Sequence, residues 1–451
     1  MAIALDGGAP ESGPDGLPGQ LGRVRFDSRI YKLPRQLPSL TEPYVGLNSS
    51  SAGNAIPGRF ARTESSGQER TETESSVSAP EFDASLVKES FGRLLDAGAA
   101  ATEYLYGRLF AASPDTQSLF PMEMSAQREH FFAALSRLVW SLDTGPGCAA
   151  MLVSLGREHR KFGVTDRYYD AFFSALGETV CRFDPDGWQP EVESAWRGAL
   201  RYASAQMRAG AAADAATAPA WWVAEIADHD LRSPGVAVLR LAPTQPLPYA
   251  AGQHVSVQVT RWPRVWRPFS AATAPRPDGI IELHVRAVPG GLVSNTLVHH
   301  SAVGDTVLLG AADGSMVLAD SDRDLVCVAG GTGLAPIKAI IEQAIVASRS
   351  GRARRITLFF GARQHYDLYD LADLQLLESA YPYLRVIPVL SEDPAFGGLA
   401  GLLPDVVHAQ GSSMFQNCEA YICGPPGMVR RTATVLAASI PPGQLHYEPP
   451  L

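Results

Sequence analysis

Residues 325–336 read Leu-Val-Cys-Val-Ala-Gly-Gly-Thr-Gly-Leu-Ala-Pro, an apolar run followed at once by a glycine-rich turn and a proline. A short run of buried apolar residues is typical of a central parallel strand, and proline favours the first turn of a helix. Glycines between a strand and a helix let the backbone approach a phosphate group at the helix N-terminus. The stretch therefore predicts a strand, a phosphate-binding turn and a helix of a dinucleotide-binding domain.

The rest of residues 321–451 supports a doubly wound α/β domain. Further apolar runs at 356–360, 384–390 and 421–423 alternate with helical stretches, as in a parallel sheet. The last run ends at Cys423-Gly424-Pro425, on the same carboxyl edge as the glycine turn, where a thiol can contact a nicotinamide ring. Cys423 alone would more often be a buried strand residue. The predicted NAD(P)-binding residues are Gly331, Thr332, Gly333, Leu334, Ala335, Pro336, Cys423, Gly424 and Pro425.

Residues 219–320 show a different pattern. Apolar residues alternate with period two at 237–241, 255–259 and 281–285, and glycine and proline separate the runs. Several short strands of this kind predict a small antiparallel β-barrel.

Two segments of this barrel carry residues suited to a flavin. Arg267 can neutralise a pyrophosphate, Phe269 can stack on the isoalloxazine ring, and the Ser270 hydroxyl can hydrogen-bond near the flavin N5 atom. The Gly290-Gly291 turn and the residues after it offer backbone amides and a hydroxyl for the same phosphates. For any one residue an ordinary strand position is the plainer interpretation, but the two segments before a dinucleotide domain favour FAD. The predicted FAD-binding residues here are Arg267, Pro268, Phe269, Ser270, Gly290, Gly291, Val293 and Ser294.

The first half of the chain contains a polar segment and an all-α domain. Residues 1–80 are rich in Gly, Pro and Ser and predict a disordered tail, with a start codon placed too far upstream as the alternative. Residues 81–213 carry apolar side chains at helical spacing and predict an all-α domain. A small-residue linker is expected at 210–219.

Composition narrows the class of protein. The chain has 451 residues, a formal charge of −9 and five scattered cysteines. These values give no reason to expect a nucleic-acid or membrane partner, and they fit a reduced, cytoplasmic protein. The N-terminal residues lack the basic start and apolar core of a signal peptide. We expect a monomer or weak dimer whose protein partner, if any, is unknown.

Residues 219–451 resemble the ferredoxin–NADP reductase superfamily, and residues 81–451 as a whole resemble the flavohaemoglobins, in which a globin is fused to such a reductase. The globin resemblance rests on the segments Tyr104–Phe110, Leu119–Met122 and Gln127–Glu129. It implies a globin fold for the helical domain, with haem b, FAD and NADH or NADPH as cofactors. The implied activity is nitric oxide dioxygenation, in which NAD(P)H electrons pass through FAD to haem, and nitric oxide and dioxygen become nitrate.

The resemblance also assigns roles in the helical domain. His159 would be the axial ligand of the haem iron, although a lone histidine on an apolar face is more often a core residue. Phe120 and Phe131 would pack around the porphyrin, and Tyr106 with Gln127 would line the oxygen side. Tyr169 matches a tyrosine beside the axial histidine. His130 is expected to face solvent.

Three departures from the family pattern are visible. The glutamate that contacts the axial histidine in the family falls at Ala211, and residues 206–210 hold no carboxylate. The family continues after the segment 446–451 with an aromatic-Gly-Pro sequence that covers the flavin. His254, which we expect at the flavin, replaces a usual tyrosine, and Phe269 lacks a tyrosine hydroxyl. A divergent branch with an incomplete proximal relay is therefore expected.

Two other functions stay open at this point. The protein could be a haem-based oxygen or redox sensor, or a flavin reductase that serves an external acceptor. The choice between NADH and NADPH is also open, because Arg363 could bind a 2′-phosphate but no nearby acidic residue favours NADH.

Overall fold

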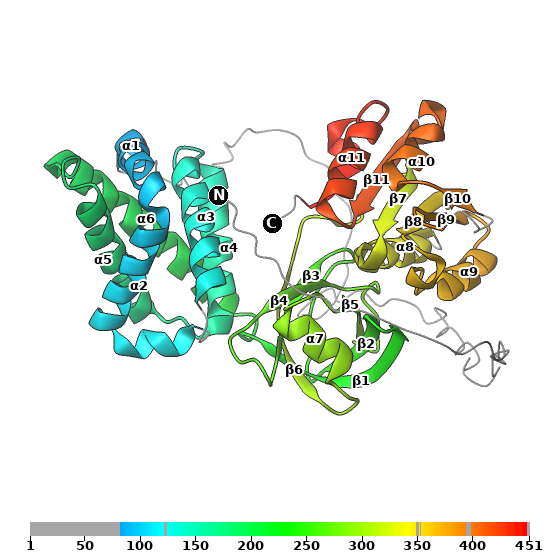
Figure 1. Ribbon diagram of the computed structural model, residues 1–451, viewed down its shortest axis with the longest axis horizontal. Helices are drawn as coiled ribbons and strands as arrows, with labels where there is room; N and C mark the ends of the chain where they lie inside the picture. The colour runs from blue at the N-terminus through cyan, green and yellow to red at the C-terminus, as the bar shows by residue number, and fades with distance from the viewer. Residues whose placement is uncertain (1–81, 121–123, 349–350, 352, 394–397, 449–451) are drawn as a thin grey trace, which may run out of the picture. The chain divides into compact units, whose positions relative to one another are not determined.

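The computed structural model describes residues 82–120, 124–348, 351, 353–393 and 398–448. In chain order these residues form a helical domain, an antiparallel barrel and an α/β domain (Figure 1). The predicted fold class is thus confirmed, while the prediction for residues 1–80 lies outside the described residues.

Six α-helices form the first domain in the described residues 82–215, and apolar side chains at helical spacing fill its core. Asp83 caps the first helix by accepting hydrogen bonds from the backbone amides of Ser85 and Leu86. The helices are α1 (Ala84–Leu94), α2 (Gly98–Ala112), α3 (Ser125–Ser141), α4 (Pro146–His159), α5 (Asp166–Phe183) and α6 (Pro190–Ala215).

Helices α4 and α6 cross at two glycines. A Cβ atom on Gly156 would overlap the carbonyl oxygen of Met207, and one on Gly210 would overlap the carbonyl oxygen of Val153. The two backbones can approach this closely only because both positions lack a side chain. Helix α6 continues to Ala215, so the predicted linker from 210 is partly helical, since its alanines are strong helix formers.

The second domain is a six-stranded antiparallel sheet with the order β4-β3-β6-β1-β2-β5. Its helix α7 (Leu292–His299) packs against β3 and β5. Residues at alternate positions of these strands fill one core, as the period-two pattern predicts. The strands are β1 (Trp222–Ser233), β2 (Val236–Pro243), β3 (His254–Val259), β4 (Arg267–Ser270), β5 (Ile281–Arg286) and β6 (Thr306–Asp313).

The third domain is a parallel sheet with the order β10-β9-β8-β7-β11-β12. Its strands are β7 (Asp324–Gly330), β8 (Ile356–Ala362), β9 (Leu384–Leu390), β10 (Leu399–Ala400), β11 (Cys418–Cys423) and β12 (Leu445–His446). Its helices are α8 (Leu334–Ser348), α9 (Leu371–Ala380), α10 (Leu403–Ala409) and α11 (Pro426–Leu436). No helix in the described part of the chain is both long and apolar enough to cross a bilayer.

The barrel and the α/β domain share buried polar residues. All of β5 from Ile281 to Val285 is buried, including Glu282 and His284, which the alternating pattern would place towards solvent. Side chains of the α/β domain cover this face of β5, among them Lys338 of α8. One turn further along α8, Glu342 accepts a hydrogen bond from the Ala274 amide of the barrel at 3.1 Å.

Glu342 is expected to make stability depend on pH. Its burial raises the pKa from the ordinary 4.5 to about 7, an effect that nearby Lys338 only partly opposes. The unfolded chain therefore loses this proton first as the pH rises, so the free energy of unfolding falls between about pH 4.5 and 7. We expect Glu342→Gln to be more stable than the wild type by on the order of 3 kcal/mol at pH 8. Urea unfolding of both proteins at pH 5 and pH 8 measures this difference, and a gain of equal size at both values would contradict it.

Candidate functional site

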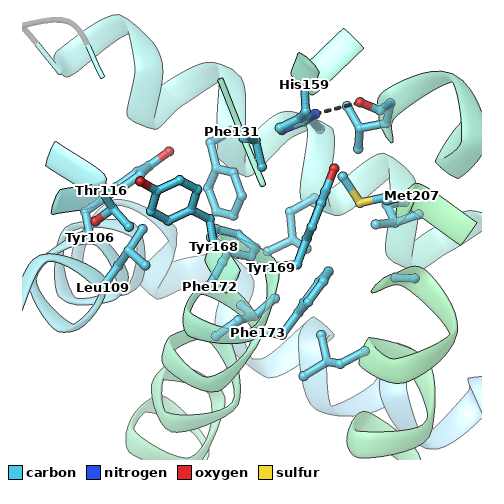
Figure 2. A pocket seen from close by; sticks show the side chains of 18 of the residues that line it. Tyr106, Leu109, Thr116, Phe131, His159, Tyr168, Tyr169, Phe172, Phe173 and Met207 are labelled. Atoms are coloured by element: carbon cyan, nitrogen blue, oxygen red, sulfur yellow. Dashed lines mark hydrogen bonds between the residues drawn. The ribbon is translucent and has the colours of Figure 1, made fainter. Parts of the chain in front are cut away.

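The helical domain encloses a cavity of about 370 Å³. Most of its walls come from α2 to α6, with further contributions from residues 116–120 and from Arg264 of the barrel, and they are mostly aliphatic and aromatic side chains (Figure 2). The polar groups among the lining residues are few, and His159, Tyr169 and Tyr106 are three of them. Such a cavity suits a flat, mostly apolar ligand that is held by one polar contact.

His159 is the last residue of α4 and borders the cavity. Its Nδ1 atom lies 2.6 Å from the carbonyl oxygen of Leu155, one turn earlier in the helix (Figure 2). A carbonyl oxygen can only accept, so Nδ1 carries the proton and Nε2 keeps its lone pair. Burial lowers the pKa of His159, which favours the same neutral form. The imidazole is therefore in the tautomer that binds a metal through Nε2.

Tyr169 lies on α5 and contributes a buried hydroxyl to the same cavity. Among the described residues this hydroxyl has no hydrogen-bond partner. No carboxylate of a described residue forms an ion pair with His159, whose Nδ1 is bonded to a backbone carbonyl instead. The expectation, based on Ala211, that the histidine lacks a carboxylate contact stays a prediction.

Three aromatic side chains, Tyr106, Phe120 and Phe131, form another wall of the cavity. The ring centre of Tyr106 lies 5.3 Å from that of Phe120 and 5.8 Å from that of Phe131, both in edge-to-face contact. The structure thus brings together the residues predicted for this wall, with the exception of Gln127, whose side chain is not described. The side chain of His130 also lies outside the described part.

The predicted flavin-binding residues come from neighbouring elements of the barrel. Strands β3 and β4 pair so that His254 lies opposite Ser270, and Val255 opposite Phe269. Arg267 and Pro268 are exposed at the start of β4, whereas Phe269 and Ser270 are partly buried. An exposed guanidinium beside a half-buried ring is the arrangement that a dinucleotide phosphate and a flat flavin require.

The glycine turn at 290–291 precedes α7. Gly290 has φ of +72°, a conformation that favours glycine, and Gly291 is the N-cap of the helix. Val293 and Ser294 are buried in the first turn of α7. The turn therefore presents backbone amides at a helix start, as the sequence predicts, while its role in FAD binding stays a prediction.

The predicted nicotinamide segments meet at the carboxyl edge of the parallel sheet. Gly331–Gly333 forms a short turn between β7 and α8, and Leu334, Ala335 and Pro336 are buried at the start of that helix. A Cβ atom on Gly333 would lie 2.5 Å from the carbonyl oxygen of Cys423, so the glycine turn touches the Cys423–Gly424 segment directly. Burial raises the pKa of the Cys423 thiol to about 11, which keeps it neutral at pH 7. Pro425 is exposed just beyond it.

Arg286 is a residue that the sequence patterns do not single out. It ends β5, and its guanidinium would lie 3.5 Å from a Cβ atom on Gly331, which has φ of +55°. The guanidinium of Arg286 forms no ion pair or hydrogen bond with another described residue. The signal that could have identified it is its position at the end of a barrel strand, four residues before the Gly290 turn.

Comparison with known proteins identifies all three domains. Residues 103–207 match the globin family, residues 224–317 the oxidoreductase FAD-binding domain, and residues 327–434 the oxidoreductase NAD-binding domain. A flavohaemoglobin from Malassezia yamatoensis aligns with 80% of this chain and 98% of its own, at a TM-score of 0.64 and 16% identity. This likeness shows a common fold.

Curated relatives resemble part of the chain. The electron transfer component of xylene/toluene monooxygenase from Pseudomonas putida is 36% identical over 205 residues, which is 45% of this chain and 57% of that protein. The ferredoxin–NAD(P)+ reductase component of the naphthalene 1,2-dioxygenase/salicylate 5-hydroxylase systems from Ralstonia sp. is 36% identical over 225 residues, or 49% and 65%. The chain thus spans less than two thirds of these relatives.

The chain combines a globin domain with an oxidoreductase FAD-binding domain and an oxidoreductase NAD-binding domain. This is the domain architecture of the flavohaemoglobins, and it confirms the resemblance seen in the sequence. The three families imply haem, FAD and a nicotinamide nucleotide as cofactors. The apolar cavity, the free Nε2 of His159 and the unpartnered hydroxyl of Tyr169 fit a haem group.

Proposed function

We propose that the protein is an NAD(P)H-driven nitric oxide dioxygenase. The observation that supports this most directly is the tautomer of His159, whose Nε2 is free to bind iron beside an apolar cavity. A globin that only stored oxygen would have no use for fused flavin and nicotinamide domains. Dioxygen, nitric oxide and NAD(P)H are then the small-molecule partners.

We assign a separate role in this reaction to each of four residues of the helical domain. His159 would hold the haem iron, and haem supplies the redox chemistry that converts dioxygen and nitric oxide to nitrate. The Tyr106 hydroxyl, in a buried residue, would donate a hydrogen bond to an oxygen atom that gains negative charge. Phe120 and Phe131 would exclude water and admit only small diatomic molecules.

The reductase residues would deliver the electrons. Arg267 would hold the FAD pyrophosphate, Phe269 would stack on the flavin, and Ser270 would hydrogen-bond near N5. Gly331–Gly333 would bind the nucleotide phosphates, with Cys423 beside the nicotinamide as a neutral thiol. Hydride transfer between the two cofactors needs no charged side chain at that position.

The test is a stoichiometric assay on purified protein that contains haem and FAD. Each nitrate formed from nitric oxide and dioxygen takes up one electron, so about two molecules of nitric oxide should disappear per NAD(P)H oxidised. Nitrate should appear in the same amount. NAD(P)H oxidation that leaves nitric oxide unchanged would overturn the proposal.

A second function is favoured by the curated relatives, which are electron-transfer components of oxygenase systems. The protein would then reduce an external acceptor, and the globin would have another role. This alternative predicts rapid reduction of an added iron–sulfur protein and slow reduction of the haem within the same chain.

Arg286 gives a prediction for the nucleotide site. We propose that its guanidinium binds a phosphate of NAD(P)H beside Gly331, because it lies next to this turn without a counter-ion among the described residues. Arg286→Met should raise the KM for the nucleotide about tenfold, the loss of one charge-assisted hydrogen bond, with a smaller effect on kcat. Steady-state ferricyanide reduction measures both constants.

The matched control is Arg355→Met. Arg355 pairs with Asp324, the first residue of β7, and so lies at the opposite end of the strand from the glycine turn. Its replacement should leave the KM unchanged. Equal changes in both variants would show that a general loss of positive charge, and not a phosphate contact, is responsible.

A further inference from the structure

A buried lysine joins the barrel to the α/β domain. The Nζ atom of Lys338 lies 3.0 Å from Glu282 Oε1, which belongs to the barrel, and 3.0 Å from Asp370 Oδ2, which belongs to the α/β domain. Glu282 is 5% exposed and Asp370 is fully buried. One cation therefore neutralises a buried carboxylate from each domain.

Lys338, Glu282 and Asp370 form a charged triad, and further contacts between the two domains surround it. His284 on β5 lies with Nδ1 2.8 Å from the hydroxyl of Tyr369 and with Nε2 3.1 Å from Glu282 Oε1. Arg232 on β1 pairs with Asp370 at 3.2 Å and with Asp373 at 2.8 Å. The barrel thus contributes Arg232, His284 and Glu282. Each of these three side chains contacts a polar side chain of the α/β domain.

Charges in this cluster are fixed by their partners. Burial alone would favour neutral Lys338, but Asp370 and Glu282 hold its pKa well above the ordinary value. Burial likewise opposes the charged form of Glu282, and Lys338 holds its pKa well below the usual range. A displacement of one domain would leave at least one of these charges buried without a partner, which is strongly unfavourable.

The triad also lies close in sequence to both cofactor-binding turns. Lys338 is in the second turn of α8, directly after the Gly331–Gly333 turn. Glu282 is near the start of β5, which ends at Arg286, shortly before the Gly290–Gly291 turn. The helix that begins at the nucleotide site and the strand that leads to the flavin site are therefore joined by the lysine itself.

We propose that Lys338 is a positioning residue, which sets the nucleotide-binding domain on the flavin barrel and so aligns the nicotinamide with the flavin. A buried cation that needs one carboxylate from each domain is satisfied in a single docking geometry. An apolar contact would tolerate sliding, because it has no direction. This inference rests on the FAD- and NAD-dependent oxidoreductase activity and not on the nitric oxide reaction.

Lys338→Met, which keeps an unbranched side chain of similar length, tests the proposal. The rate of FAD reduction by a saturating concentration of whichever of NADH and NADPH reduces the wild type faster, followed by stopped-flow absorbance, should fall at least tenfold. FAD content and the FAD absorption spectrum should stay as in the wild type. The unfolding temperature of the protein without nucleotide should fall, because Glu282 and Asp370 lose the cation that they share, while the contacts of Arg232 and His284 with the α/β domain remain.

The double variant Lys338→Met/Glu282→Gln separates positioning from stability. After the first change Glu282 has lost its lysine and still contacts Arg240 at 3.2 Å and His284 at 3.1 Å. Neutralising it removes a buried charge that has lost part of its compensation, so the unfolding temperature should recover in part. The reduction rate should stay low, because nothing restores the docking geometry. If Lys338→Met does not fold, this double variant provides the measurement.

Arg323→Met is the matched control, because Arg323 pairs with the buried Glu419 at 3.1 Å entirely within the α/β domain. It should lower the unfolding temperature and leave the reduction rate unchanged. The proposal is overturned if the single or double lysine variant reduces FAD at the wild-type rate. It is also overturned if the control slows reduction as much as they do. Because FAD reduction is measured without nitric oxide, failure of the dioxygenase proposal would not affect these outcomes.

Discussion

Replacement of His159 by glycine should yield a folded protein that has lost its haem but keeps its FAD. Among the described residues that line the cavity, His159 is the imidazole whose Nε2 can bind iron, and its orientation is fixed by the hydrogen bond to Leu155. We expect the ratio of Soret absorbance to protein to fall at least tenfold, since a bond to the metal is worth several kcal/mol. NADH oxidation with ferricyanide should stay at the wild-type rate.

Added imidazole provides the control for this result. A glycine at 159 leaves space for a free imidazole, which should restore haem binding and part of the nitric oxide consumption. His300→Gly, at an exposed position of the barrel, should change neither property. A variant at 159 that retains a normal Soret band would exclude this histidine as the ligand.

Replacement of Gly156 by alanine should have the second large effect. The new methyl group would overlap the Met207 carbonyl, so α4 and α6 would have to separate. Overpacking of this kind typically costs about 1–3 kcal/mol, and an unyielding backbone atom favours the upper end. Because α4 ends at His159 and Met207 also borders the cavity, haem retention should fall with stability.

Gly177→Ala is the comparison for this variant. Gly177 lies within α5, and a Cβ atom there would meet no atom within 4 Å. Alanine should stabilise the helix at this position by about 0.5–1 kcal/mol. Thermal unfolding and haem loss to apomyoglobin measure both variants, and equal effects would show that the crossing of α4 and α6 is not the critical feature.

The sequence predicted the fold class of each part of the chain, because each part has its own repeating pattern. Apolar residues at helical spacing, at period two and in short buried runs correspond to the helical domain, the barrel and the parallel sheet. The glycine turn and Cys423 could be placed together because carboxyl ends of parallel strands share an edge. Their contact through Gly333 agrees with that reasoning.

Features that depend on contacts between distant segments could not be predicted from the sequence. Nothing in the period-two pattern of β5 indicates that Glu282 and His284 are buried, since their partners Lys338 and Tyr369 belong to another domain. Arg286 was missed for the same reason. The tautomer of His159 follows from a backbone carbonyl, which no side-chain pattern reveals.

With His159 as the proposed ligand of the haem iron, its hydrogen bond to a backbone carbonyl would affect the reduction potential of the haem. A carbonyl oxygen is a weaker acceptor for the Nδ1–H hydrogen bond than a carboxylate is. The imidazole therefore stays neutral and would be a weaker electron donor to the iron than one bonded to a carboxylate. A weaker donor stabilises ferric iron less, which raises the potential of the ferric/ferrous couple. Electron transfer from reduced flavin would then be more favourable, while the iron would give less electron density to bound oxygen.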